Sequence, residues 1–489
     1  MTSNAPPPSS TASSRLGHAL RKQAKHAANE SGFLLVPDGV NALAIRLLLA
    51  DQADVSIDAQ YYEIDNDLTG HLFIEALLRA AQRGVKVRLL IDDYKTDGHD
   101  SGLAALREQP NFEFRIYNPY ERKTSRIVEG LNSFARINRR MHNKSYTVDR
   151  QMTVIGGRNI GDPYFNVSDE VNFADLDTVA IGPLVADVSS MFDAYWNSSE
   201  AVPIEQVMKD NEGSKKTLSE LLAKLITAKE SIAGTKYADA IQNSILDKLN
   251  HSRDVFTWAP YQFVYDLPDK THYRDNSAMV SRSIIDEFDK IENEVVLVSP
   301  YFVPRSVGVQ HFTELRKKGI DVTVITNSLA SNNQIYAHGG YAPVRKPLLK
   351  VGVRLFELRA DVDVKHQTFE GSKPNKATLH TKAFAIDRRK LFIGSFNFDS
   401  RSANINTEVG VFIDSPKLAT MLMKDAFASA RTQSYEVKIG LFGYLEWHGW
   451  KRVHGKADKK IVLYQEPNTS PKQRAAALAA QLLPIRSQV

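Results

Sequence analysis

The stretch HNKSYTVD at residues 142–149 decides the fold, because it returns in the same pattern as HTKAFAID at residues 380–387. Both copies follow His-x-Lys-x4-Asp, and each Asp is followed ten positions later by an Asn, Asn159 in the first copy and Asn397 in the second. A single copy of so short a motif is a weak signal. Two copies with the same trailing Asn indicate that the chain contains a duplicated domain.

The segments before each motif repeat as well. An apolar run at 55–62, a helical stretch ending at Gly84 and a second run at 85–92 correspond to 295–302, a stretch ending at Gly319, and 320–326. Further strand candidates lie at 112–117 and 353–357. Alternating strands and helices predict an α/β fold in which helices cover buried sheets.

The length of 489 residues suits two lobes, each with its own core. We predict a flexible basic tail at 1–30, a first lobe at 31–203, a helical linker at 204–255, and a second lobe at 256–489. A basic stretch between Arg15 and His26 is interpreted as a solvated helix end, with an anionic-lipid anchor as the alternative. We expect no transmembrane helix, because charged residues and a proline interrupt the apolar stretch at 32–50.

The composition excludes several classes of chemistry. There are no cysteines, so disulfides, thiolate zinc sites and cysteine nucleophiles are ruled out. Lys and Arg total 62 against 57 for Asp and Glu, a formal net charge of +5. This excess is compatible with an anionic lipid surface but smaller than that of a dedicated nucleic-acid binder.

The two motifs resemble the HKD motifs of the phospholipase D superfamily. The stretches RRMHNKS at 139–145, GGRNIGD at 156–162 and GGY at 339–341 further resemble bacterial cardiolipin synthases of the C type, and the similarity extends roughly from residue 39 to residue 484. The resemblance implies two similar lobes, each a mixed β-sheet flanked by helices. It also implies that a pseudo-twofold axis relates the lobes and that one active site lies between them.

The motif residues suit phosphoryl transfer through a covalent intermediate. One His would attack phosphorus to form a phosphohistidine, while the other would exchange protons with the leaving and entering alcohols. The resemblance favours His142 as the nucleophile and His380 as the acid and base. No metal or other cofactor is expected, because lysines supply the positive charge. The groups expected to stabilise the phosphate oxygens are Lys144, Lys382, Asn159 and Asn397.

Carboxylates are expected to support both motifs. A nucleophilic His needs an acceptor for its second ring nitrogen, and the candidates are Asp177 and Glu408, with Asp175 as a competitor for the first position. Asp149 and Asp387 complete the motifs, where we expect them to order the loops rather than act on the substrate.

A second group, His338, Tyr341 and Arg345, offers a weaker signal. Their positions resemble those where the subgroup could meet a lipid headgroup. The same spacing of three and four residues also describes an ordinary amphipathic helix, so both interpretations stay open.

The preferred function is the synthesis of cardiolipin from phosphatidylglycerol and a second phospholipid, with phosphatidylethanolamine as a candidate donor. The alternatives are a phospholipase D that releases phosphatidic acid, a nucleic-acid phosphodiesterase, and an inactive lipid-binding module. Nucleic acid is disfavoured by the modest charge, and inactivity by the two complete motifs. Phospholipid substrates require a membrane surface, so we expect a peripheral location on the bacterial cytoplasmic (inner) membrane.

Overall fold

A computed structural model of the chain describes residues 13–21, 29–96, 106, 109–121, 134–207, 214–235, 238–239, 255–271, 279–362, 376–453 and 456–482. Most of the predicted tail, 1–12 and 22–28, and the end of the predicted linker, 240–254, lie outside the described residues.

The first lobe alternates strands with helices, as the repeated apolar runs predict. Its elements are α2 (Arg15–Leu20), β1 (Glu30–Val36), α3 (Gly39–Gln52), β2 (Ser56–Tyr61), α4 (Leu68–Gln82), β3 (Lys86–Asp92), β4 (Phe112–Tyr117), α7 (Phe134–Ile137), β5 (Ser145–Val148), β6 (Met152–Gly156), η1 (Asp162–Phe165), β7 (Val171–Ala174), β8 (Asp177–Ile181), α8 (Leu184–Trp196) and β9 (Ala201–Pro203). Two helices follow, α9 (Ile204–Val207) and α10 (Ser214–Ile232), and α10 packs on α4 of this lobe. The domain boundaries themselves stay a prediction.

The second lobe repeats this order and extends it at the C-terminal end. Its elements are β10 (Thr257–Tyr265), η2 (Pro268–Thr271), α13 (Met279–Phe288), β11 (Glu294–Val298), α14 (Arg305–Lys317), β12 (Asp321–Asn327), α15 (Ile335–Tyr341), η3 (Ala342–Val344), α16 (Arg345–Lys350), β13 (Arg354–Leu358), β14 (Lys376–Leu379), β15 (Ala383–Ile386), β16 (Lys390–Gly394), α17 (Ser400–Asn404), β17 (Val409–Asp414), α18 (Pro416–Gln433), β18 (Ser434–Ile439), β19 (Leu445–Val453), β20 (Lys456–Leu463) and α19 (Pro471–Leu482).

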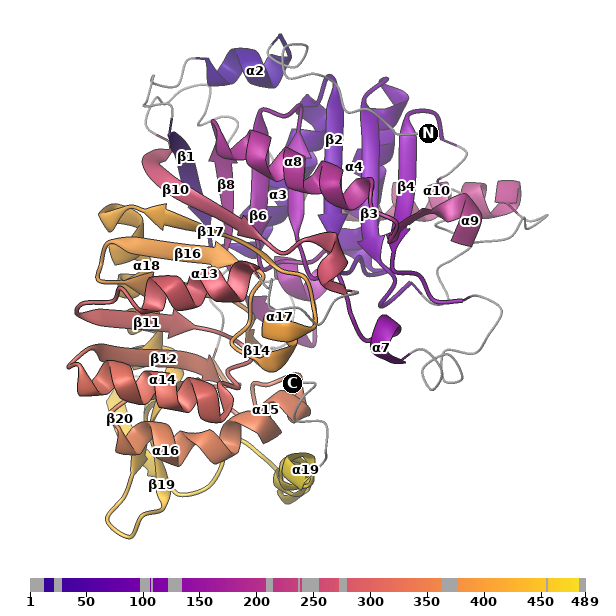
Figure 1. Ribbon diagram of the computed structural model, residues 1–489. Coiled ribbons are helices and arrows are strands. Elements are labelled where there is room, and N and C mark those ends of the chain that lie inside the picture. The colour runs from indigo at the N-terminus through magenta and orange to yellow at the C-terminus, as the bar shows by residue number, and fades with distance from the viewer. Residues whose placement is uncertain are drawn as a thin grey trace.

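The strands of both lobes join into one sheet. In the described part of the chain its order is β9-β4-β3-β2-β5-β6-β8-β1 in the first lobe, continued by β10-β17-β16-β15-β11-β12-β13-β18-β19-β20 in the second. The join is the antiparallel pair β1–β10, where Glu30 lies opposite Pro260 and Phe33 opposite Thr257 (Figure 1). The mixed α/β fold with two similar lobes is therefore confirmed.

The parallel strands at the centre of each lobe explain the predicted runs. β2, β3 and β4 pair in parallel, as do β11, β12 and β13, and helices cover them. Both sets are largely buried and apolar, as parallel strands usually are. The glycines after α4 and α14 adopt left-handed φ values, 95° at Gly84 and 83° at Gly319, which end the helix and turn the chain into the next strand.

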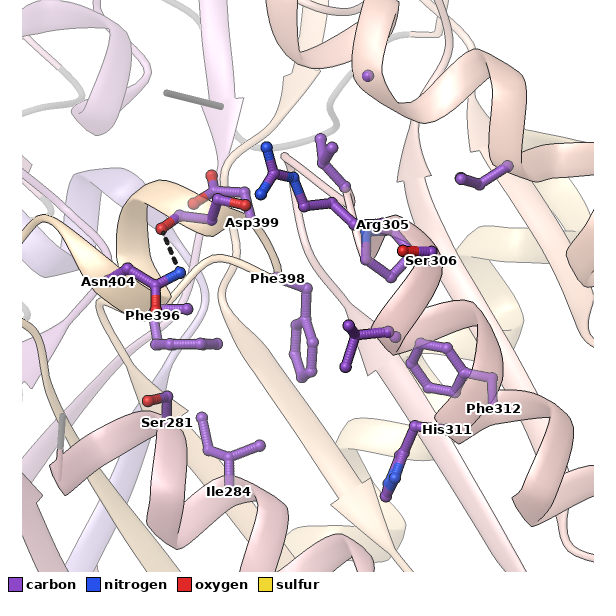
Figure 2. Close-up of a pocket in the computed structure, with 18 of the residues that line it drawn as sticks. Ser281, Ile284, Arg305, Ser306, His311, Phe312, Phe396, Phe398, Asp399 and Asn404 are labelled. Atoms are coloured by element: carbon purple, nitrogen blue, oxygen red, sulfur yellow. Dashed lines mark hydrogen bonds between the residues drawn. The ribbon is translucent and has the colours of Figure 1, made fainter. Parts of the chain in front are cut away.

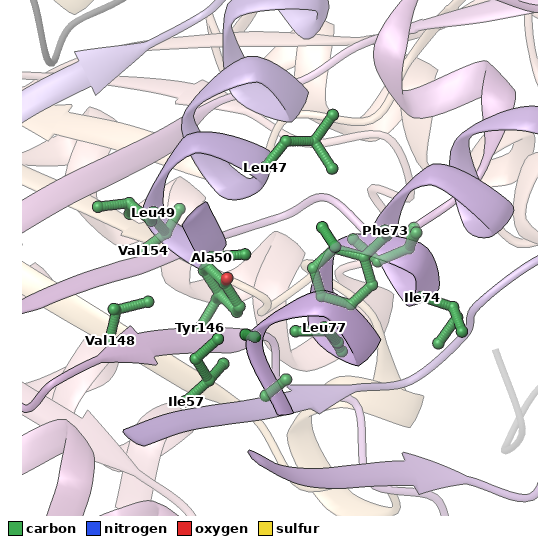
Figure 3. Packing of buried hydrophobic residues seen from close by; sticks show 14 of the residues in the cluster. Leu47, Leu49, Ala50, Ile57, Phe73, Ile74, Leu77, Tyr146, Val148 and Val154 are labelled. Carbon is green, nitrogen blue, oxygen red and sulfur yellow. The ribbon is translucent and has the colours of Figure 1, made fainter. Parts of the chain in front are cut away.

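Among the residues that the structure describes, the hydrophobic interior has three parts. In the first lobe, α3 and α4 pack on the sheet through residues such as Leu49, Phe73 and Leu77 (Figure 3). A similar cluster fills the second lobe. The third lies between the lobes and combines α8 residues such as Met191 with α18 residues such as Leu422. Because this shared cluster is a true core, it fixes the position of one lobe against the other.

Two short pairings cross between the lobes beside the motifs. β14, just before the second motif, pairs in parallel with β7 of the first lobe, so that Leu379 lies opposite Ala174. In the equivalent place, Met141 forms a parallel bridge with Thr407. Each motif therefore starts next to a strand end of the opposite lobe.

The Asp of each motif opens a tight hairpin turn. Asp149 and Arg150 have φ values of 49° and 50°, and Asp387 and Arg388 have 52° and 53°, as a two-residue type I′ turn requires. The Asp149 carboxylate accepts hydrogen bonds from the backbone N–H groups of Asp54, Val55 and Ser56 at 2.8 to 3.2 Å. The Asp387 carboxylate accepts three in the same way from 292–294 at 2.8 to 3.0 Å. Each Asp thus ties its hairpin to the start of β2 or β11.

The tip of the β18–β19 hairpin presents apolar side chains to solvent. Leu441 is 100% exposed and Phe442 89%, while Trp447 further along β19 is buried. None of the helices in the described ranges combines the length and the apolar character that spanning a bilayer requires.

Removing the Asp149 carboxylate should destabilise the protein more than removing that of Asp387. Asp149 is fully buried, so Asp149→Ala leaves buried backbone N–H groups without an acceptor, which should lower the free energy of unfolding by about 2 to 4 kcal/mol. The donors around Asp387 are more exposed and can bind water, so Asp387→Ala should cost about half as much. Scanning calorimetry of both variants measures the difference, and equal melting temperatures in the two would contradict this role.

Candidate active site

His142 is held by a carboxylate from the other lobe. It lies in the extended segment directly before β5, where its backbone N–H donates to the backbone carbonyl of Thr407 at 3.0 Å. Its ring Nδ1 lies 2.9 Å from Oε2 of Glu408, which precedes β17. Because a carboxylate accepts at Nδ1, that nitrogen bears the proton and Nε2 keeps a free lone pair.

His380 is held in the same way in the opposite direction. Its N–H donates to the carbonyl of Ala174 at 2.7 Å, and its Nδ1 lies 2.5 Å from Oδ2 of Asp175, between β7 and β8. Each lobe therefore supplies one histidine and the carboxylate that orients the other. The two motifs form a single site at the lobe interface.

The two motif lysines fold back beside their histidines. Nζ of Lys144 donates to the His142 carbonyl and Nζ of Lys382 to the His380 carbonyl, both at 2.6 Å. Nζ of Lys382 also lies 3.0 and 3.1 Å from the two ring nitrogens of His380. Both lysines are buried at this site.

Burial and the lysine charges keep both histidines neutral. Burial, followed by Lys144 and Lys382, lowers the pKa of His142 well below its usual range. Burial and Lys382 lower the pKa of His380 to about 3 against the opposing effect of Asp175. Because both lysines act on both rings, the four groups share one electrostatic environment.

The lysines and the carboxylates are perturbed as well. Burial lowers the pKa of Lys382 to about 8 and that of Lys144 well below its ordinary value. Burial raises the pKa of Glu408 to about 7, although Lys144 opposes the shift. Burial would also raise the pKa of Asp175, but His380 and Lys382 outweigh it and hold that pKa below its ordinary value. At neutral pH, Asp175 is therefore ionised while Glu408 is partly protonated.

Aromatic rings and the two motif asparagines line the rest of the site. Phe173 stacks on His380 with ring centroids 5.2 Å apart, and Tyr62 meets His142 edge-on at 5.1 Å. Asn159 donates to the Tyr164 hydroxyl at 2.9 Å. The buried Oδ1 atoms of Asn159 and Asn397 have no hydrogen-bond partner in the described part of the chain. Such unpaired amides at equivalent places in both lobes fit a site that binds a polar ligand.

Asp177 does not serve the site as predicted. Its carboxylate lies 2.9 Å from Nη2 of Arg46 and 3.4 Å from Nη1 of Arg158, in a buried ion pair of the first lobe. Asp175 has the predicted role instead, and it orients His380 rather than His142. Glu408 does orient a histidine, but that histidine is His142 of the opposite lobe.

The strand register explains why Asp175 matches Glu408. Gly156 pairs with Asp177, and the equivalent Gly394 pairs with Gly410. Asp177 therefore corresponds to Gly410, and the residues two positions earlier are Asp175 and Glu408. Gly157 offers a second signal, because a Cβ there would lie 2.3 Å from Oδ1 of Asp175. Aligning the two repeats at the strand after each Gly-x-x-Asn would have identified Asp175.

His338, Tyr341 and Arg345 belong to a separate buried network, which corrects the expectation that they meet a headgroup. Arg345 pairs with Glu357 at 3.1 Å and Glu466 at 2.5 Å, and Nε2 of His338 lies 3.3 Å from Glu466. The Arg345 guanidinium also lies over the Tyr341 ring. These contacts link α15 and α16 to β13 and the segment after β20, so we assign the three residues a structural role.

The arrangement has the parts for a two-step displacement at phosphorus. One neutral imidazole offers a free Nε2 as nucleophile, the other can exchange a proton, and two ammonium groups can hold an anion. Across the described residues, no three His, Asp or Glu side chains gather as metal ligands. That the reaction needs no metal stays a prediction.

The family model described as "Cardiolipin synthase, PLD-like domain" matches residues 47–196 and 284–429, one match in each lobe. Among solved structures, the phosphatidylserine synthase of Haemophilus influenzae superposes with a TM-score of 0.57 at 13% sequence identity. The superposition covers 87% of this chain and 92% of the other, so it supports the two-lobe fold.

Curated relatives match over most of the sequence. Cardiolipin synthase C of Escherichia coli is 36% identical over 96% of this chain and 99% of its own length. A cardiolipin synthase of Clostridium perfringens is 22% identical over 77% of this chain and 66% of its own length. With both motifs inside the matched regions, this chain belongs to the cardiolipin synthase family of phospholipase D-like phosphatidyltransferases.

Proposed function

We propose that this enzyme transfers a phosphatidyl group from one phospholipid to a glycerol hydroxyl of phosphatidylglycerol, which forms cardiolipin. The observation that supports the proposal most is the reciprocal pairing of His142 with Glu408 and of His380 with Asp175 beside two buried lysines. Phosphatidylethanolamine and a second phosphatidylglycerol are the candidate donors. The similarity to a cardiolipin synthase of the C type supports the choice of acceptor.

In the first step, Nε2 of His142 attacks the phosphorus of the donor lipid. A P–N bond forms, the P–O bond to the headgroup alcohol breaks, and His380 gives its proton to the departing oxygen. In the second step, His380 takes the proton from a phosphatidylglycerol hydroxyl. The new alkoxide attacks phosphorus, the P–N bond breaks, and the enzyme returns to its starting state.

The carboxylates support this division of roles. Asp175 is ionised at neutral pH, so it stabilises an imidazolium on His380 and suits that residue to carry the proton. Glu408, with a pKa raised by burial to about 7, is a weaker source of negative charge, so His142 stays neutral and nucleophilic. A bound phosphodiester adds a negative charge beside the lysines, which raises the proton affinity of His380 when the substrate arrives.

The lysines and asparagines would stabilise the phosphorane-like transition state. Lys144 and Lys382 can turn from the histidine carbonyls to the non-bridging oxygens without leaving the site. Asn159 and Asn397 can present an N–H to the same oxygens, because a 180° flip exchanges the two ends of an amide. These contacts strengthen as charge builds on the oxygens, which is where they accelerate the reaction.

The exposed β18–β19 tip would contact the membrane peripherally. Leu441 and Phe442 are apolar and solvent-exposed, and Lys346 lies 5.9 Å from the Tyr444 ring beside them. An apolar tip next to a basic side chain suits the interface of an anionic bilayer, as expected for the inner membrane.

The product assay tests the proposed function. The purified protein is incubated in EDTA with vesicles of phosphatidylglycerol and phosphatidylethanolamine, and the lipids are analysed by mass spectrometry. We expect cardiolipin from the wild type and at least a thousandfold less from His142→Ala, because the covalent route is removed. Phosphatidic acid without cardiolipin would identify a hydrolase, and dependence on an added divalent ion would contradict the metal-free reaction.

The same assay with a donor radiolabelled at phosphorus assigns the histidines. Quenching with base, which preserves phosphohistidine, should leave the label on the peptide that contains His142. Label on the His380 peptide alone would reverse the assignment.

The rate should fall in mildly alkaline solution. The pKa of Lys382, lowered by burial to about 8, means that this lysine loses its charge as the pH rises through 8. kcat/KM should then decrease above pH 8, about tenfold per pH unit, because phosphate binding loses an ammonium. In Lys382→Arg, which is less active but always charged, the part of this decrease that Lys382 causes should be lost. An unchanged alkaline limb in Lys382→Arg would contradict the assignment.

Membrane contact through the hairpin tip can be measured by vesicle sedimentation. The double variant Leu441→Ser/Phe442→Ser should bind phosphatidylglycerol vesicles about tenfold more weakly, because it loses apolar area that would enter the interface. Ile226→Ser, which removes an exposed apolar side chain from α10, serves as the control and should bind normally. Equal binding by the double variant and the wild type would exclude this contact.

A further inference from the structure

A large cavity lies in the second lobe next to the active site. Its volume is about 1080 Å³, slightly larger than the usual range for small-molecule sites. It is lined by residues of α13, α14 and α15 and of the segment 396–404 (Figure 2). None of the steps proposed above uses it.

The cavity lining is predominantly apolar. Figure 2 shows Ile284, Phe312 and Phe398 facing the same space, whereas Asp399 and Arg305 lie together at one end of it. Two further lining residues, Ile285 and Val307, are 54% and 79% exposed, so apolar surface continues from the interior to solvent. A site with one polar end and a long apolar body has the polarity of an amphiphile.

Close backbone packing forms the wall that α15 contributes. A Cβ on Gly340 would lie 2.6 Å from Cγ1 of Val303, and a Cβ on Gly339 would lie 2.9 Å from Cβ of Ala480. Because both glycines line the cavity, α15 lies directly against its neighbours at these two positions, while Tyr336 of the same helix also lines the cavity. A side chain at Gly340 would displace Val303, which also lines the cavity.

One wall is shared with the catalytic centre. Phe396 and Phe398 line the cavity on either side of Asn397, the asparagine of the second motif. Asp399, at the polar end, acts electrostatically on Lys382 and raises its pKa against the effect of burial. The segment is held in place because the Phe398 carbonyl accepts a hydrogen bond from the N–H of Val303 at 2.7 Å. The cavity thus lies next to the candidate phosphate site, against the same segment of chain.

We propose that this cavity binds one acyl chain of the glycerophospholipid whose phosphate lies between His142 and His380. The inference rests on the proposed function, because it needs a phospholipid in the site. The polar end of the cavity lies near the phosphate, and the apolar body takes the chain that leaves the bilayer. Each methylene moved from water into such a site favours binding by up to about fourfold.

The proposal is tested by varying the acyl-chain length of the lipid in a variant whose cavity is partly filled. Ser281 lines the cavity from α13, so Ser281→Trp should fill part of it. Ser283, on the same helix but outside the lining, donates to the Met279 carbonyl, and Ser283→Trp is the matched control. Neither residue belongs to the catalytic machinery.

With dioleoyl phosphatidylglycerol in detergent micelles, Ser281→Trp should lower kcat/KM at least tenfold. With the dihexanoyl lipid, kcat/KM should stay within twofold of wild type, because a short chain needs little of the cavity. Ser283→Trp should resemble the wild type with both lipids. An equal loss with long and short chains, or no loss with either, would overturn the acyl-chain assignment while leaving transferase activity intact.

A binding readout separates this proposal from the reaction itself. Phosphatidylglycerol with a diazirine at the end of one acyl chain, in phosphatidylethanolamine vesicles, should cross-link to α13, α14 or residues 396–404, and less so in Ser281→Trp. Such cross-links without any lipid turnover would support the acyl-chain site and end the transferase proposal. Cross-links confined to other segments, together with lipid turnover, would overturn the acyl-chain site and support the transferase proposal.

Discussion

The exchange of carboxylates between the lobes is the constraint on which the active site depends. His142 needs Glu408 of the second lobe, and His380 needs Asp175 of the first. Neither lobe can orient its own histidine, so the site exists only when the two lobes are docked. This explains why the interface contains a shared hydrophobic core and a strand pairing, β7–β14, directly beside the catalytic groups. A displacement of 1 Å between the lobes would separate both pairs at once.

Much of this architecture could be predicted from the sequence because the chain contains two repeats of the same sequence pattern. The apolar runs, the helix-ending glycines and the spacing of the motifs follow local rules, and the structure confirms the strands and helices they indicate. Asp177, the wrongly predicted partner, shows what sequence spacing does not determine. Its distance from His142 along the chain resembles that of Glu408 from His380. Which carboxylate contacts which histidine depends instead on the strand register and on the docking of the opposite lobe. The two interpretations of His338 and Arg345 stayed open for the same reason, because helical spacing does not reveal that Glu466, over a hundred residues later, contacts both side chains.

The duplicated sequence does not produce a symmetric site. One histidine is paired with an aspartate held ionised by His380 and Lys382, and the other with a glutamate whose pKa burial raises to about 7. Ser395 also donates to Glu408, while the first lobe has Gly157 at the corresponding place after Gly156. The proposed reaction through a covalent intermediate needs unequal partners, one nucleophile and one proton carrier. The differences around the two imidazoles would supply this inequality.

The buried lysines of the site favour the binding of an anionic phosphodiester. Burial disfavours the charged form of a lysine because it removes the ammonium group from water, and the pKa of each of the two lysines is lowered for this reason. Of the two carboxylates that orient the histidines, Asp175 is ionised at neutral pH and Glu408 is partly protonated. In the proposed reaction, the phosphodiester brings a negative charge next to Lys382 and raises the proton affinity of His380. The substrate itself would then supply the charge that His380 needs to act as the general acid.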